Sequence, residues 1–168
     1  MCGILGVVQG RGMKVDSAEI AAAAAAIRHR GPDDSGVWTE ANVTFGHRRL
    51  SIVDLSPAGH QPMVSACGRY VLTYNGEIYN HRVLRAELDA SAPHAWRGES
   101  DSEVLLETIA RLGIERALQK ANGMFAFALW DRQEGRLFLA RDRFGEKPLY
   151  YAVRGDSFAF ASELVALE

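Results

Sequence analysis

The sequence contains little cysteine: two residues, Cys2 and Cys67, in a chain of 168. They lie far apart and form no CxxC pair, which excludes a fold stapled by several disulfides or by a zinc-ribbon site. The five histidines show no metal-ligand spacing either, so we expect no metal site. A chain with so few thiols is typical of a reducing cytoplasm.

Long hydrophobic runs and an excess of basic residues are also missing. The stretch "AEIAAAAAAI" is too short and too weakly apolar to span a membrane, and no basic residue precedes the apolar N-terminus as in a signal peptide. The formal net charge is −2, so neither nucleic acid nor an anionic membrane is an expected partner. The phosphate-binding patterns GxxxxGK[ST] and GxGxxG do not occur.

The length and the 48% of hydrophobic residues predict one globular domain over residues 1–168. "CGILGVV" reads as a buried strand, followed by a helix over 17–28 that Asp16 caps, and by two strands within 36–55 that turn at Asn42. Further helices are expected over 81–88, from Ser100 to Gly113 with Glu103 as the capping-box partner, and over 115–120. Four strand segments follow, from "MFAFALWD" to "SFAFAS".

Two segments indicate how these elements pack. "MFAFALW" is apolar at nearly every position, so both faces of its sheet should be buried, one under helices and the other under a second sheet. "RYVLTYNGEIYN" carries Asn75-Gly76 between apolar and aromatic residues, which predicts a hairpin with a tight turn at this dipeptide.

Cys2 is the first candidate for chemistry, since it follows the initiator Met1. The simpler interpretation is a small buried residue at the start of a strand. If Met1 is removed, as the small size of cysteine leads us to expect, Cys2 carries a thiol and an α-amine with usual pKa values near ~8.5 and ~7.7–8.0. The amine can then accept the proton of the thiol and later protonate a leaving group, so Cys2 becomes a candidate nucleophile.

The other candidates are dispersed polar residues. Asn75 and Gly76 either form a turn only or supply an amide and a backbone N–H to a developing oxyanion. Glu77 can accept hydrogen bonds from an amine or amide of a ligand. Arg49 either lies on an exposed strand face or forks around a carboxylate, and Asp101 either favours a helix N-terminus or balances a substrate ammonium.

These segments together resemble a known family. They resemble, in order along nearly the whole chain, the N-terminal glutaminase domain of glutamine-hydrolysing asparagine synthetases, a class II glutamine amidotransferase with an N-terminal nucleophile. The segments that carry the resemblance are "MCGILGVV", "RHRGPDDSG", "HRRLSIVDL", "GHQPM", "YNGEIYNH", "GESDSEVLL", "GMFAFALWD", "RDRFGEKPLYY" and "FASEL".

The resemblance implies an α+β fold of four αββα layers, two antiparallel sheets between layers of helices. It implies that Cys2 attacks the side-chain amide of L-glutamine, releases ammonia and forms a γ-glutamyl thioester that water hydrolyses. Asn75 and Gly76 match the oxyanion donors of the family. The residues that match its substrate-binding positions are Arg49 for the α-carboxylate, Glu77 and Asp101 for the α-amine and the amide, and Leu50, Ser51, Ile52 and Val53 for backbone contacts.

The sequence ends without the SGGxD motif of the ATP-dependent synthetase domain that follows in this family. We therefore expect the chain to stop before such a domain, and ATP and magnesium to act only there. Three alternatives stay open: a module that binds glutamine or a partner domain without turnover, a domain that supplies ammonia to another activated carboxylate, and a homodimer. Retention of Met1 would favour the module without turnover.

Overall fold

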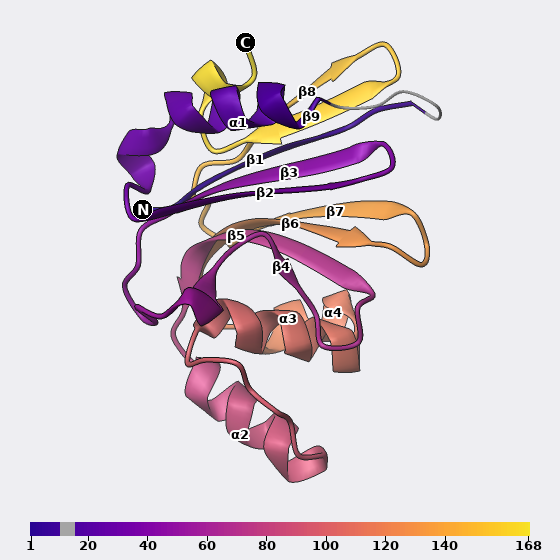
Figure 1. The fold of residues 1–168 in the computed structure, drawn as a ribbon. Helices are drawn as coiled ribbons and strands as arrows, with labels where there is room; N and C mark the ends of the chain where they lie inside the picture. The colour runs from indigo at the N-terminus through magenta and orange to yellow at the C-terminus, as the bar shows by residue number, and fades with distance from the viewer. Residues whose placement is uncertain (11–15) are drawn as a thin grey trace.

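The computed structural model describes residues 1–10 and 16–168, which form two stacked antiparallel sheets with helices on both outer faces (Figure 1). The first sheet has the strand order β2 (Asp34–Glu40), β3 (Val43–Arg49), β1 (Gly3–Val8), β9 (Ser157–Ala161), β8 (Tyr150–Arg154). The second has the order β4 (Met63–Val64), β5 (Tyr70–Ile78), β6 (Gly123–Asp131), β7 (Arg136–Arg141).

The helices complete four layers, so the expected αββα arrangement is confirmed. Helix α1 (Ser17–Ala26) covers the first sheet, whereas α3 (Asp101–Leu112) and α4 (Ile114–Lys120) cover the second, with α2 (His81–Ser91) packed beside α3 (Figure 1). Single turns of 3₁₀-helix occupy Arg28–Arg30, Pro57–Gly59 and Leu164–Ala166.

Strand β6 shows why the layers form. Its side chains alternate, and Phe125, Phe127 and Leu129 pack into the core under the helices. Ala126, Ala128 and Trp130 pack into a second core between the two sheets. Both faces of the strand are buried, as its apolar run predicts.

The predicted hairpin at Asn75-Gly76 is wrong. Strand β5 runs straight through the dipeptide and pairs it with Ala126 and Phe125 of β6. A Cβ atom at Gly76 would lie 2.4 Å from the Met124 carbonyl oxygen, so glycine is needed here for close approach and not for a turn. Asn75 is thereby held on a rigid strand instead of a loop.

The predicted start and end of α3 are confirmed, with one difference. Ser100 Oγ accepts a hydrogen bond from the Glu103 N–H at 3.3 Å, and Gly113 takes φ 81° beyond the last turn. The Glu103 carboxylate does not return to the cap. It accepts hydrogen bonds from the N–H groups of Arg97 and Gly98, at 3.0 and 3.1 Å, and so organises the segment that leads into α3.

His47 provides a test of the packing between the sheets. Its ring is fully buried, Nε2 lies 3.0 Å from the Tyr74 carbonyl oxygen, and burial lowers its pKa to about 4. Between pH 6.5 and pH 4 the unfolded chain therefore binds a proton that the native protein excludes. The free energy of unfolding therefore falls as the pH drops below 6.5, by about 2 kcal/mol between pH 7 and pH 5.

The test compares wild type with His47→Gln, which can still donate to the carbonyl but does not titrate. We measure the free energy of unfolding in urea at pH 7 and at pH 5. The decrease between these two pH values should be about 2 kcal/mol smaller in the variant than in wild type. Equal dependence in the two proteins would show that His47 is protonated in the native core.

Candidate active site

A cavity of about 130 Å³ opens where the start of β1, the end of β3 and the middle of β5 meet. This volume suits a small ligand rather than a large cofactor. Nine of the residues predicted from the sequence line the cavity: Cys2, Arg49, Leu50, Ile52, Val53, Asn75, Gly76, Glu77 and Asp101. Residues from distant parts of the chain thus converge on one volume.

Ser51 is the predicted residue that does not line this cavity. Ser51 lines a neighbouring hollow instead. Its backbone N–H donates to the Asp33 carboxylate at 2.8 Å. Ile52 and Val53 do line the cavity, although the two residues are 70% and 40% exposed. The segment after β3 therefore forms an open rim.

Cys2 lies directly before β1, and its half-buried thiol faces the backbone of Leu50. The Leu50 N–H donates to Sγ at 3.4 Å, and Sγ lies 3.6 Å from the Leu50 carbonyl oxygen. Burial raises the pKa of the Cys2 thiol, against the opposing effects of the Leu50 N–H, the amino terminus and Arg49. A thiol in this setting needs a nearby base to become a thiolate.

Arg30 fixes the backbone of Cys2, a contact that sequence reasoning missed. Its Nε donates to the Cys2 carbonyl oxygen at 2.9 Å, and Nη1 donates to Glu163 at 2.9 Å. The side chain is buried, so this pair ties the first residues to the C-terminal segment. The segment "RHRGPDDSG" contains Arg30, but its sequence does not reveal Glu163 as a long-range partner.

Asn75 is buried, and within residues 1–10 and 16–168 its side-chain amide nitrogen has no hydrogen-bond partner. A buried amide nitrogen without a partner costs free energy, so its retention calls for a functional explanation. The amide lines the cavity that contains the Cys2 thiol. It is placed to donate to an oxygen atom bound there.

The backbone N–H of Gly76 points away from β6, toward the same edge of β5 as the N–H groups of Tyr74 and Ile78. The N–H groups of Tyr74 and Ile78 point away from β6, to Gln61 Oε1 at 2.7 Å and to Asp101 Oδ2 at 2.9 Å. Residues two apart in a strand direct their N–H groups alike, so the Gly76 N–H points between them and away from β6. It forms a second donor beside the Asn75 amide.

Arg49 ends β3 and is nearly buried. Its guanidinium donates to the carbonyl oxygens of Asp54 and Ser56, the latter at 2.9 Å, and a Cβ atom at Gly59 would collide with it. Since a guanidinium has five N–H donors, it can still bind a carboxylate in the cavity.

Asp101, in the first turn of α3, lines the same cavity as Arg49. Its Oδ2 accepts hydrogen bonds from the Tyr74 hydroxyl at 2.8 Å and from the Ile78 N–H at 2.9 Å. Burial, and then the Asp101 charge, raise the pKa of Tyr74 well above its usual value, so the hydroxyl remains a donor. The protein thus engages one oxygen of Asp101, and the Glu77 carboxylate adds a second negative charge to the same cavity lining, where a ligand ammonium can bind.

Lys147 is a further cavity residue that the sequence did not reveal. Asp142 accepts hydrogen bonds from four backbone N–H groups, those of Phe125, Phe144, Glu146 and Lys147. This turn buries Lys147 against the cavity, where its Nζ lies 3.3 Å from Met1 Sδ. Other lining residues that were not predicted include Gln61, Tyr74, Ser100, Ser102 and Met124.

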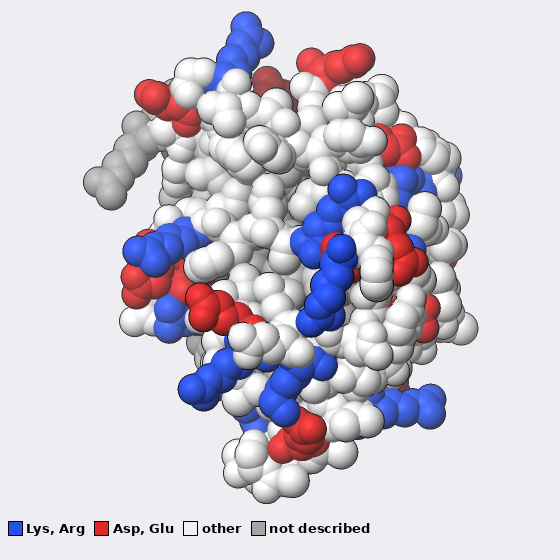
Figure 2. All heavy atoms as spheres, turned by 180° about the vertical axis from the view of Figure 1, so that it is seen from behind, with Lys and Arg blue, Asp and Glu red and all other residues white. Residues whose placement is uncertain are grey.

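The described residues contain neither a metal-binding cluster nor a membrane-spanning helix. Among residues 1–10 and 16–168, no three His, Cys, Asp or Glu side chains are grouped to hold a metal ion. In the same part of the chain, no helix has the length and apolarity needed to cross a membrane. On the face shown in Figure 2, basic and acidic side chains are interspersed, as on a solvated surface.

Comparisons with known proteins agree with this geometry. Residues 1–168 match the family model of the glutamine amidotransferase domain. The chain is 44% identical to asparagine synthetase [glutamine-hydrolyzing] 3 of Bacillus subtilis and 41% identical to asparagine synthetase B [glutamine-hydrolyzing] of Escherichia coli, over 99% of its own length in both cases. It spans only 27% and 30% of those two relatives.

A solved structure shares the fold. The glutamine phosphoribosylpyrophosphate amidotransferase from B. subtilis superimposes with a TM-score of 0.82 at 23% identity, covering 99% of this chain and 43% of that one. The full-length family match, the identity to the synthetases and the common fold lead to one conclusion: the chain belongs to the glutamine amidotransferase family.

Proposed function

We propose that this domain hydrolyses the side-chain amide of L-glutamine to glutamate and ammonia, with Cys2 as the nucleophile. The observation that carries the proposal is the buried Asn75 amide nitrogen, which has no hydrogen-bond partner among the described residues and belongs to a residue lining the cavity that contains the Cys2 thiol. A donor held ready without a partner is what an oxyanion site requires.

The reaction follows from the groups in the cavity. After Met1 is removed, the α-amine of Cys2 takes the proton of the thiol, and the thiolate adds to the amide carbon of glutamine. The oxyanion accepts hydrogen bonds from the Asn75 amide and the Gly76 N–H. As the intermediate collapses, the α-ammonium returns its proton to the departing nitrogen, which leaves as ammonia. Water then hydrolyses the γ-glutamyl thioester and restores the thiol.

Substrate recognition uses the two charged sides of the cavity. The Arg49 guanidinium binds the α-carboxylate of glutamine, and Asp101 and Glu77 bind its α-ammonium and amide. Leu50, Ile52 and Val53 border the bound molecule with their backbone groups, whereas Ser51 lies outside the cavity with its N–H bound to Asp33. Both ends of a free amino acid are thereby held while its side-chain amide reaches Cys2.

The ammonia is proposed to serve asparagine synthesis. The relatives are named glutamine-hydrolysing asparagine synthetases, and the chain spans about a quarter to a third of their length. A synthetase domain joined to this one would use ATP and magnesium to activate the acceptor carboxylate. We place the pair in the cytoplasm, where Cys2 and Cys67 stay free thiols, as they are in the structure.

The test compares ammonia release from L-glutamine by processed wild type and by Cys2→Ala. We expect the variant to fall to the uncatalysed background, because it lacks the nucleophile. Equal ammonia release by the two proteins would contradict the proposal. Glutamine binding by wild type without ammonia release would instead favour a binding module without turnover.

A further inference from the structure

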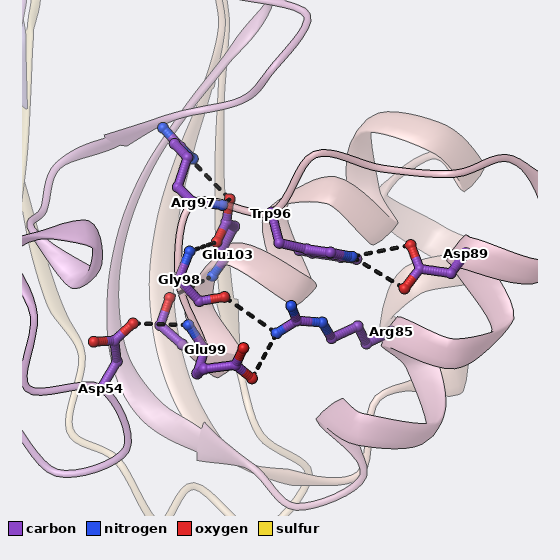
Figure 3. A network of polar contacts seen from close by, with 9 residues as sticks. Asp54, Arg85, Asp89, Trp96, Arg97, Gly98, Glu99 and Glu103 are labelled. Carbon is purple, nitrogen blue, oxygen red and sulfur yellow. Dashed lines mark hydrogen bonds and ion pairs between the residues drawn. The ribbon is translucent and has the colours of Figure 1, made fainter.

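Asp54 connects two segments that border the cavity. Its carboxylate is buried, and Oδ1 accepts from the Ser56 N–H at 2.7 Å. Oδ2 accepts from the Glu99 N–H at 2.8 Å (Figure 3). Although burial opposes ionisation, these hydrogen bonds hold the pKa of the Asp54 carboxyl below its usual value. The anion therefore joins the segment after β3 to the segment before α3.

The first segment sets the position of Arg49. Both acceptors of the guanidinium, the carbonyl oxygens of Asp54 and Ser56, lie in the turn that the Asp54 carboxylate closes. A Cβ atom at Gly59 would lie 2.1 Å from a guanidinium nitrogen, so the turn encloses the side chain. A shift of this turn moves the group that binds the α-carboxylate.

The second segment sets the position of Asp101, which follows Glu99 by two residues. Figure 3 shows how it is held: Arg85 of α2 donates to the Gly98 carbonyl oxygen at 3.1 Å and to the Glu99 carboxylate at 2.8 Å. Glu103 of α3 accepts from the Gly98 N–H on its other side. The segment is therefore fixed to both helices, and through Glu99 to Asp54.

The contact between the two segments leaves no spare room. A Cβ atom at Gly98 would lie 2.3 Å from Asp54 Oδ2 and 2.8 Å from the Ala58 Cβ atom. Glycine is thus required because the carboxylate and the chain approach closely. The separation of the segments depends on this contact, and with it the separation of Arg49 and Asp101.

We propose that Asp54 is a positioning residue for substrate selection, which fixes the Arg49 guanidinium and the Asp101 carboxylate at the spacing of the two charged groups of a free α-amino acid. The inference rests on the proposed function, since it assigns these two side chains to the ends of glutamine. It predicts that Asp54 governs the preference for L-glutamine over a simple amide without acting on the reacting atoms.

Asp54→Asn tests this with little change in size. An asparagine keeps one oxygen acceptor and turns an NH₂ group toward the other backbone N–H, so one of the two links breaks. We expect KM for L-glutamine to rise about 10-fold or more, with kcat within about threefold of wild type. The kcat/KM for butyramide, which has neither α group, should stay unchanged. Asp89→Asn is the matched control, because this carboxylate binds the Trp96 indole N–H at the far end of the same network (Figure 3).

The Gly98→Ala variant changes the spacing of the two segments without removing the charge of the Asp54 carboxylate. The added methyl group pushes the segments apart while the Asp54 carboxylate remains, so KM for L-glutamine should rise in this variant as well. Thermal unfolding by circular dichroism shows which variants fold. If Asp54→Asn does not fold, the KM of Gly98→Ala tests the proposal. A wild-type KM in the folded variants, or an equal loss of kcat/KM for butyramide, would overturn the proposal.

Calorimetric binding of L-glutamate makes the test independent of turnover. The product carries both α groups, so we expect Asp54→Asn to weaken its binding about 10-fold or more. If wild type binds glutamate but hydrolyses no glutamine, the proposed function fails while a weakened variant still supports Asp54. If turnover is normal and binding is equal in both proteins, the inference about Asp54 fails alone.

Discussion

Replacing Asn75 by alanine is expected to lower kcat for glutamine hydrolysis by about 10²–10³, with KM within a few-fold of wild type. The reason is that the oxyanion exists only during the reaction, so its donor stabilises the transition state and not the bound substrate. The amide nitrogen has no hydrogen-bond partner in the described protein, so its removal breaks no hydrogen bond of that NH₂ group.

The same variant makes an opposite prediction for stability. Removing a buried polar group without a partner is not expected to lower the midpoint of thermal unfolding, because the desolvation cost of the amide disappears with it. Asn75→Asp, which keeps the shape but replaces the donor by an acceptor, should be at least as slow as the alanine variant. A raised KM with wild-type kcat would instead assign Asn75 to ground-state binding.

Protein that retains Met1 is expected to release ammonia no faster than Cys2→Ala. With Met1 in place the α-amine is one residue away from the thiol, and Cys2 carries a peptide nitrogen that cannot act as a base. Met1 also lines the cavity, and Lys147 donates to its sulfur atom. The retained residue therefore removes the base and occupies substrate space.

Intact-mass measurement identifies the two forms, and a single preparation can supply both. Protein made while methionine aminopeptidase is inhibited should be inactive, and treatment with that enzyme should restore ammonia release in proportion to the fraction that starts at Cys2. Full activity of the Met1 form would show that the α-amine is not the base.

The layers were predictable because they depend on local pattern. The uninterrupted apolar run of β6 predicts burial on both faces, and Ser100 with Gly113 predicts the bounds of α3. The sequence does not reveal the role of Gly76, because a turn and a close approach both select glycine and only the opposite strand distinguishes them. The close approach at Gly98 has the same cause and was equally hidden.

The site was predictable where the resemblance supplied residues, and not where long-range contacts position them. Arg30 and Lys147 reach Cys2 and Met1 from opposite ends of the chain. Ser51 lies within the matched segment, yet the end of β3 turns its N–H to Asp33 instead of the cavity. Such contacts depend on how the layers stack, which residue spacing does not encode.

The central claim is that Cys2, with a free α-amine, forms a thioester with the γ-carbonyl of glutamine. The most direct measurement is acid quenching of processed protein during turnover of L-glutamine, followed by mass spectrometry of the N-terminal peptide. We predict a peptide that begins at Cys2 and carries one acid-stable γ-glutamyl group, absent from Cys2→Ala. Steady ammonia release with no glutamyl group on Cys2, or with the group on Cys67, would contradict the account.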